Sequence, residues 1–241
     1  MEIEELLRRY AAGERDFFQL DLSRVSLREA NLLNINLTQA NLSYSDLREA
    51  RLGQAKLAYA TLIGTNLSET ILWGCDLSYA NLSQAQLREA DLTGAKLIQT
   101  QLSDSKLLKV CFSGANLTGA NLSRSLLFEA DFRPSSDQQT DLGYTDFTGA
   151  DLSYAHLSGA LLRGANLEGA TLCRAILEFR RDLPYETNLT DANLQGADLS
   201  YANLKGVNLA NANLRGADLT RTILKDANLQ GAIMPDGIIH D

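Results

Sequence analysis

The sequence has few of the residues on which several classes of protein depend. Three cysteines among 241 residues are too few for a disulfide framework, and the odd count leaves at least one of them unpaired. Neither of the two histidines, His156 and His240, has a cysteine or a carboxylate at metal-ligand spacing, so we expect no metal site. The low cysteine content is typical of the reducing cytoplasm.

Long apolar runs and an excess of positive charge are also missing. No apolar run approaches the roughly 20 residues that a membrane span needs, and the acidic N-terminus is unlike a secretion signal. The formal net charge is -8 and the pI is near 4.9, whereas nucleic-acid-binding proteins normally carry a basic patch. We therefore expect a cytoplasmic monomer that contacts neither a membrane nor nucleic acid directly.

What the sequence has instead is a five-residue repeat. From Leu22 to Leu107 a leucine stands at every fifth position, and leucine or phenylalanine continues this phase to Leu177 except at Asp137. The residue two positions before each leucine is small, most often alanine, and the residue between them is commonly Asn or Asp. The consensus Ala-(Asn/Asp)-Leu-x-x recurs about forty times along the chain.

A period of five fits neither of the regular elements. On an α-helix, five steps rotate each leucine by about 140° from the last, so no apolar stripe forms. On a flat strand, an odd period sends successive leucines to opposite faces. All the leucines can point inward only if the chain turns once in every repeat, which predicts a coil with several short sides.

A longer period of twenty indicates the number of sides. Glutamates recur at multiples of twenty, with Lys109 filling the one gap in the series, and four repeats in each turn of the coil explain this spacing. We expect equivalent residues to stack in columns, including a second acidic column of Asp91, Asp131 and Asp151. The residues of the glutamate series are Glu29, Glu49, Glu69, Glu89 and Glu129.

This pattern resembles the pentapeptide-repeat family over nearly the whole chain. The resemblance implies an all-β fold, the right-handed quadrilateral β-helix, with the small residue and the Leu or Phe facing inward and the Asn or Asp outward. We expect one solenoid domain over residues 1–241. Its repeats are expected at 17–132, 141–178 and 187–232.

The ends of the chain depart from the repeat. Residues 2–12 have apolar side chains at helical spacing, with acidic residues first and arginines last, which favours a short helix. Because the end of a solenoid exposes apolar core and unpaired backbone, we interpret this helix as an N-terminal cap. Residues 233–241 stay apolar but lose the period, and we expect them to close the other end.

Two internal breaks, at residues 133–140 and 179–186, are predicted to be loops. In the first, Asp137 occupies a leucine position, so either one side of the coil is replaced or a loop leaves and returns in register. In the second, the phase slips by two, so residues have been inserted. Loops on a rigid scaffold often carry function, and Arg and Tyr are enriched at binding hot spots. The candidate protein-binding residues are Arg133, Pro134, Asp137, Gln138, Arg180, Arg181, Asp182 and Tyr185.

The sequence offers little for catalysis. No G-x-S-x-G motif, phosphate-binding loop or dinucleotide fingerprint occurs. Cys75 stands where the repeat has alanine, so we expect a buried thiol there, and Cys111 and Cys173 form no evident redox pair. We predict a protein that is not an enzyme and has no cofactor.

Two functions are implied by the family resemblance. The N-terminal segment, the first loop and the tail are similar to those of cyanobacterial members linked to heterocyst differentiation, which implies a regulator that binds a protein of the developmental inhibition pathway. Other members mimic DNA and regulate gyrase, a type II topoisomerase, for which the glutamate column is the candidate face. Arg28, Arg48 and Arg88 lie beside these glutamates and weaken this alternative. A third alternative is a structural rod without a dedicated partner.

Overall fold

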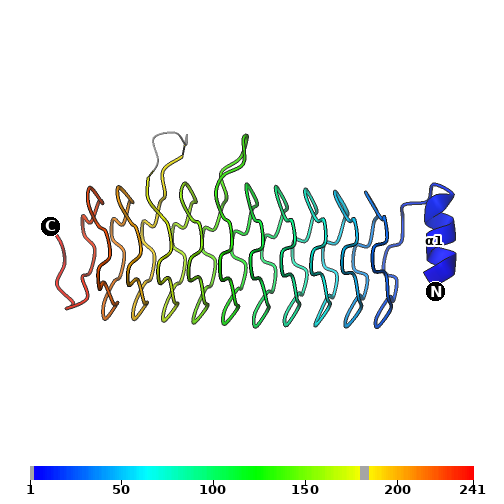
Figure 1. Cartoon of the computed structure of the whole chain (residues 1–241), viewed down its shortest axis with the longest axis horizontal. Coiled ribbons are helices and arrows are strands. Elements are labelled where there is room, and N and C mark those ends of the chain that lie inside the picture. Colours follow the sequence, from blue (N-terminus) through cyan, green and yellow to red (C-terminus); the bar gives the residue numbers. More distant parts are fainter. Residues whose placement is uncertain (1–2, 180–184) are drawn as a thin grey trace.

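The computed structural model describes residues 3–179 and 185–241. Within these residues the chain begins with one helix, α1 (Ile3–Ala11), and then winds into a regular coil whose turns stack along one axis (Figure 1). The stacked turns pair through single-residue parallel bridges, one for each repeat, rather than through long strands. One such column connects Asp21, Asn41, Thr61 and Asn81 at intervals of twenty residues. Four repeats therefore complete one turn of the coil.

Each repeat turns the chain by about a right angle at its two variable residues. At a representative corner, the Ala30 amide donates to the Leu27 carbonyl at 3.1 Å, and Glu29 has a φ of 59°. A positive φ at the third residue of such a turn is the type II arrangement. The Glu29 amide also donates to the Arg48 carbonyl of the next turn at 2.9 Å. These two hydrogen bonds offset the strain of a left-handed conformation at a residue other than glycine.

The Asn/Asp position joins neighbouring turns of the coil. The Asn41 amide donates to the Leu20 carbonyl at 2.9 Å, and the Asn41 carbonyl accepts from the Leu22 amide at 2.7 Å. Its side-chain oxygen accepts from the Ser43 amide, and its side-chain nitrogen donates to the carboxylate of Asp21, both at 3.1 Å. Asn and Asp are favoured here because their short side chains can hydrogen-bond to the backbone two residues later.

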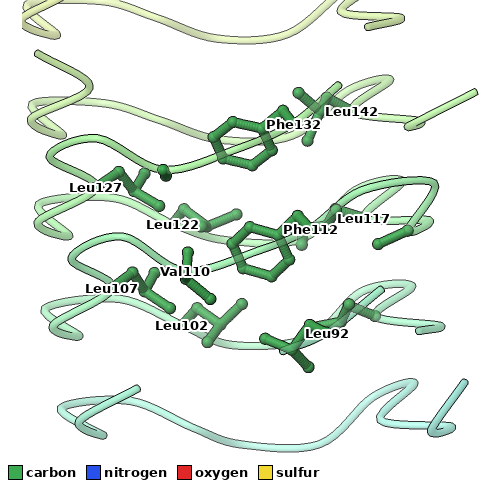
Figure 2. Close-up of a cluster of buried hydrophobic side chains, with 14 of the residues drawn as sticks. Leu92, Leu102, Leu107, Val110, Phe112, Leu117, Leu122, Leu127, Phe132 and Leu142 are labelled. Atoms are coloured by element: carbon green, nitrogen blue, oxygen red, sulfur yellow. The ribbon is translucent and has the colours of Figure 1, made fainter. Parts of the chain in front are cut away.

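Leucines and small residues fill the inside of the coil. The leucines at the centre of the repeats are buried through most of the length, and Phe112 and Phe132 stack with ring centroids 5.2 Å apart (Figure 2). Where threonine replaces alanine, its hydroxyl donates a hydrogen bond to a backbone carbonyl of the preceding turn. The Thr65 hydroxyl, for example, donates to the Leu42 carbonyl at 2.7 Å. Cys75 makes the same contact with the Leu52 carbonyl, and burial raises the pKa of its thiol to about 12. The inward orientation predicted from the five-residue period is confirmed.

The two breaks are insertions that leave the coil intact. Bridge partners are twenty residues apart up to Cys111 and Asp131, and the four bridges from Asn116–Asp141 to Asp131–His156 span twenty-five residues. The spacing then returns to twenty, as between Asp141 and Leu161. The first loop therefore leaves the coil and returns in register, which decides between the two alternatives. The second break widens the spacing to twenty-seven, as between Leu161 and Asn188.

One column predicted from the twenty-residue spacing is wrong. Asp91 and Asp131 share a column through Cys111, but the next residue in it is His156. Asp151 pairs with Leu126 on the neighbouring side. The five inserted residues of the first loop change the spacing, so residues twenty apart across that loop no longer stack.

Segments that do not follow the repeat stand at both ends of the coil. Leu6 of α1 is fully buried in the core, and the Tyr10 hydroxyl donates to the Leu33 carbonyl at 2.9 Å. At the other end the chain folds back on itself, with an antiparallel bridge between Ile233 and Ile239. The helix therefore covers apolar core at its end of the coil, whereas Ile238 and Ile239 at the other end are 65% and 63% exposed.

Candidate protein-binding surface

Both insertions leave the coil at the same corner. We call residues 133–140 loop 1 and residues 179–186 loop 2. Loop 1 projects from one edge of the molecule (Figure 1), and the residues that precede the two loops share a column, because Asp131 pairs with His156 and His156 with Ile176. The turn at Ser158 and Gly159 lies between them, since Phe132 donates to the His156 carbonyl and Leu157 donates to the Ile176 carbonyl. Arg180, Arg181 and Asp182, which the sequence placed among the binding residues, lie outside the described residues.

A threonine closes each loop. In an uninterrupted turn the corner amide donates to the next turn's backbone, as Gly94 does to the Ser113 carbonyl at 2.9 Å. Below loop 1 the Gly114 amide donates to the Thr140 hydroxyl oxygen at 2.8 Å as well as to the Arg133 carbonyl at 3.3 Å, and below loop 2 the Gly159 amide donates to the Thr187 hydroxyl at 2.7 Å. Each threonine hydroxyl is thus an acceptor for the corner amide of the preceding turn and connects the end of its loop to the coil.

Arg133 is held at the base of loop 1 by Asp131. Its guanidinium makes two hydrogen bonds to this carboxylate, at 2.7 and 3.0 Å. Burial disfavours the charged carboxylate, but the hydrogen bonds from the Arg133 side chain and amide outweigh it, so the pKa of Asp131 is below its ordinary value. The pair fixes the guanidinium while leaving 46% of the Arg133 side chain exposed.

The two loops contact each other over the turn between them. The Gln139 side-chain amide donates to the Gly159 carbonyl at 2.9 Å and to the Glu186 carbonyl at 3.3 Å. A Cβ atom on Gly159 would lie only 3.1 Å from Pro134 and 3.4 Å from the Tyr185 carbonyl oxygen. The loops therefore pack closely onto this turn, and their described residues form one surface.

A groove runs beside loop 1 where it overhangs the coil. It has a volume of about 520 Å³, and its loop side includes Asp137, Gln138 and Tyr185. Gly94 and Gly114 also line it, and Ser135 of loop 1 lies against Gly114, in the space that a side chain at that position would occupy. The structure thus brings together three of the predicted residues, whereas Arg133 and Pro134 lie at the base of the loop.

Sequence reasoning missed the residues that position this surface: Gln139, Thr140, Gly159 and Thr187. A signal for the threonines was present, because each stands at the small position directly after a break, where alanine is the common residue. The contact of Gln139 with Glu186 had no comparable signal. It joins loops that are 47 residues apart in the sequence.

The glutamate column is present, but its charge is largely paired. The column is shown by amide-to-carbonyl contacts such as those from Glu49 to Ser68 and from Glu69 to Arg88. Arg28 lies 3.3 Å from Glu29 and 2.7 Å from Glu49, and Glu89 and Glu129 have cationic neighbours of their own. This face therefore presents alternating charge rather than a continuous acidic track.

The described residues contain no group of three His, Cys, Asp or Glu side chains that could hold a metal ion. In the same residues no helix has the length and hydrophobicity needed to cross a bilayer. The chemistry on this surface consists of hydrogen bonding, ion pairing and apolar contact.

A comparison with models of protein families identifies the family to which the chain belongs. The model of the pentapeptide repeats matches eight copies, at residues 21–57, 55–94, 85–124, 112–133, 140–178 and 187–226. The chain belongs to the pentapeptide-repeat family. No match was found among curated protein sequences.

Two solved structures are among those similar to this chain. HetL from the cyanobacterium Nostoc sp. strain PCC 7120, described as involved in the regulation of heterocyst differentiation, is 56% identical over 100% of both chains, with a TM-score of 0.90. QnrB1, a plasmid-mediated fluoroquinolone resistance protein, is 16% identical over 86% of this chain and 87% of its own, with a TM-score of 0.48. The likeness to HetL confirms the predicted right-handed quadrilateral β-helix.

Proposed function

We propose that this chain is a non-catalytic protein-binding scaffold that regulates heterocyst differentiation. In this proposal the surface formed by loop 1 and loop 2 engages a regulatory protein of the developmental inhibition pathway. The observation that carries the proposal is the 56% identity with HetL over the full length of both chains. Identity at this level over the full length of both chains favours a matching role.

The construction of the loop surface supports binding. Thr140 and Thr187 connect the loop ends to the coil, and Gln139 connects the two loops. A surface held in place before binding loses little conformational entropy when a partner docks. The exposed guanidinium of Arg133 and the groove beside Tyr185 supply the ionic and apolar contacts typical of binding hot spots.

A loopless variant tests the proposal. Deleting residues 134–138 leaves Arg133 and Gln139 as the two corner residues, and deleting 179–185 leaves Glu178 and Glu186. Overexpression of the wild-type chain in Nostoc sp. strain PCC 7120 should change heterocyst frequency along the filament, and the folded loopless variant should not. An equal effect of both proteins would contradict a role for the loops.

The glutamate column gives the control for the alternative function. Regulation of gyrase by DNA mimicry requires these carboxylates, so replacing Glu29, Glu49, Glu69 and Glu89 by Gln should abolish inhibition of DNA supercoiling. The loop proposal expects this variant to retain the full effect on heterocyst frequency. Inhibition of supercoiling by the wild type and the loopless variant alike would support the alternative.

A further inference from the structure

The corner that carries the glutamates has different residue types in the second half of the molecule. The Glu129 amide donates to the Ser153 carbonyl at 3.1 Å, and the next corner residue is Tyr154. From there Tyr154 donates to Cys173, Arg174 to Ser200, and Tyr201 to Thr220, at distances of 2.8–3.0 Å. The corner column therefore continues as Tyr154, Arg174, Tyr201 and Arg221, which we call the Tyr-Arg ladder.

Each cation of this ladder lies over a tyrosine ring. The Arg174 Cζ atom is 5.6 Å from the ring centroid of Tyr154 and 5.4 Å from that of Tyr201. Arg221 lies 5.4 Å from the same Tyr201 ring on its other side. One Arg174 nitrogen also donates to the Tyr154 hydroxyl at 3.1 Å. Contacts of this kind hold the guanidinium groups in fixed positions.

These arginines have no ion-pair partner among the described residues, in contrast to the cations of the glutamate half. The ladder is also exposed, with 39% of Tyr154 and 44% of Tyr201 accessible. The residues beside it at the same corners are small: Ser153, Cys173, Ser200 and Thr220. Two fixed and unpaired guanidinium groups are thus open to an external anion.

Asp151, Asp198 and Asp218 lie in one column on the side of the coil that leads into this corner. Each accepts a hydrogen bond from the backbone amide two residues later. These carboxylates therefore lie at the start of the turn, where they accept hydrogen bonds from backbone amides. The guanidinium groups of Arg174 and Arg221 remain the cationic groups of the corner itself.

The distance between Arg174 and Arg221 indicates which kind of ligand fits. Arg174 and Arg221 are two turns of the coil apart, about 9.6 Å at a spacing of about 4.8 Å per turn. In a polyproline II helix, residues i and i+3 lie on one face about 9.3 Å apart. In a β-strand, residues on one face repeat at about 6.7 Å, which does not match. Acidic segments without a packed core commonly adopt the polyproline II conformation.

We propose that the Tyr-Arg ladder binds an acidic, extended segment of a partner protein with a carboxylate at every third residue. Arg174 and Arg221 each take one carboxylate through their N–H groups, a geometry that suits guanidinium better than ammonium. The ladder lies on a different corner from the loops, so this interaction does not depend on the proposed role of the loop surface.

Synthetic peptides test the proposal. The probe is the twelve-residue peptide (Glu-Pro-Ser)4, and its control has the same composition with the four glutamates placed consecutively. Fluorescence anisotropy at low salt should give a Kd below about 1 mM for (Glu-Pro-Ser)4 and at least fivefold weaker binding of the control. Equal affinity for both peptides, or no binding at 1 mM, would overturn the proposal.

Variants of the chain locate the site. Arg174→Gln combined with Arg221→Gln should weaken peptide binding at least tenfold, and the loopless variant should bind as the wild type does. Arg24 provides a matched control because it lies over the Tyr44 ring, at 5.2 Å, on another corner. Arg24→Gln should leave the affinity unchanged. If the double variant keeps its affinity and shows only a lower melting temperature, the ladder is a stabilising feature and the proposal fails.

Discussion

At the residue scale, the position within the five-residue unit decides what each side chain does. Leucines face inward, Asn and Asp connect turns, and the corner residues face solvent with a positive φ. Glu, Gln, Tyr and Arg are tolerated at the corner in this conformation because the backbone amide of the corner residue and that of the next residue are both hydrogen-bonded. Neighbouring residues of the same unit therefore differ greatly in their tolerance of substitution.

Leu82 and Gln84 provide a matched pair for this difference. Leu82→Asp places a carboxylate in the fully buried core, and we expect a loss of at least about 4 kcal/mol in the free energy of unfolding. Gln84→Asp changes an exposed corner residue with a φ of 61° and should cost less than about 1 kcal/mol. Urea unfolding measures both values. Equal stabilities would contradict the inward position of the leucines.

The threonine at the end of loop 2 is predicted to protect one amide. Thr187→Val removes the acceptor of the Gly159 amide and should cost about 1–3 kcal/mol. Thr187→Ser keeps a hydroxyl and should restore most of the stability. Hydrogen exchange measured by NMR should show faster exchange of the Gly159 amide in the valine variant only. Unchanged protection in that variant would show that Thr187 is not the acceptor in solution.

The Arg133–Asp131 pair predicts a dependence on pH. Because the pKa of Asp131 is lowered in the folded protein, its stabilising contribution is complete above the ordinary value of about 4 and is lost as the pH falls toward the folded pKa. Arg133→Gln should lower stability by about 1 kcal/mol at pH 7, and this difference should shrink below about pH 4. Thermal unfolding of both proteins between pH 3 and 7 checks the sign. A difference that grows on acidification would contradict it.

At the scale of elements, α1 and the two loops are the parts that do not repeat. Residues 2–12 were predicted as a helix, and the structure has α1 at Ile3–Ala11, with Glu2 outside the described residues. The loop positions followed from the breaks in phase, but their contact with each other did not. The phase of the repeat before and after a break shows how many residues have been inserted. Side-chain contacts between two loops do not change this phase, so the sequence pattern does not show them.

The capping role of α1 is tested by two adjacent leucines. Leu6 is fully buried against the first turn of the coil, whereas Leu7 is 38% exposed. Leu6→Asp should detach the helix, expose the apolar end of the coil and cause self-association, while Leu7→Asp should stay monomeric. Size-exclusion chromatography with light scattering distinguishes these outcomes. If both variants are monomeric, the prediction that α1 prevents self-association at this end is wrong.

At the scale of the whole molecule, insertions change which residues stack and so change the character of each corner. The glutamates keep a regular spacing up to Glu129, with Lys109 in the one gap, because every turn before loop 1 has twenty residues. Beyond loop 1 the same corner carries the Tyr-Arg ladder, whose spacing in the sequence is irregular. This explains why the acidic column was found from the sequence and the ladder was not.

The insertions are expected to be dispensable for the coil. Removing five residues from loop 1 and seven from loop 2 returns the bridge spacings of twenty-five and twenty-seven to twenty. The loopless variant should therefore keep the far-UV circular dichroism of a mostly β protein and a melting temperature within about 5 °C of the wild type. A collapsed or helical spectrum would contradict an insertion into a continuous coil.

The sequence by itself determined the five-residue unit, the four sides, the inward leucines and the location of both loops. Each follows from local chemistry repeated many times, because one misplaced unit would bury charge or expose leucine along the entire coil. The tertiary structure alone decided that the loops meet through Gln139, that Asp151 leaves the column of Asp131, and that Arg174 and Arg221 lie over the Tyr201 ring. These contacts depend on how many residues separate stacked turns, which is a property of the assembled coil rather than of any single repeat.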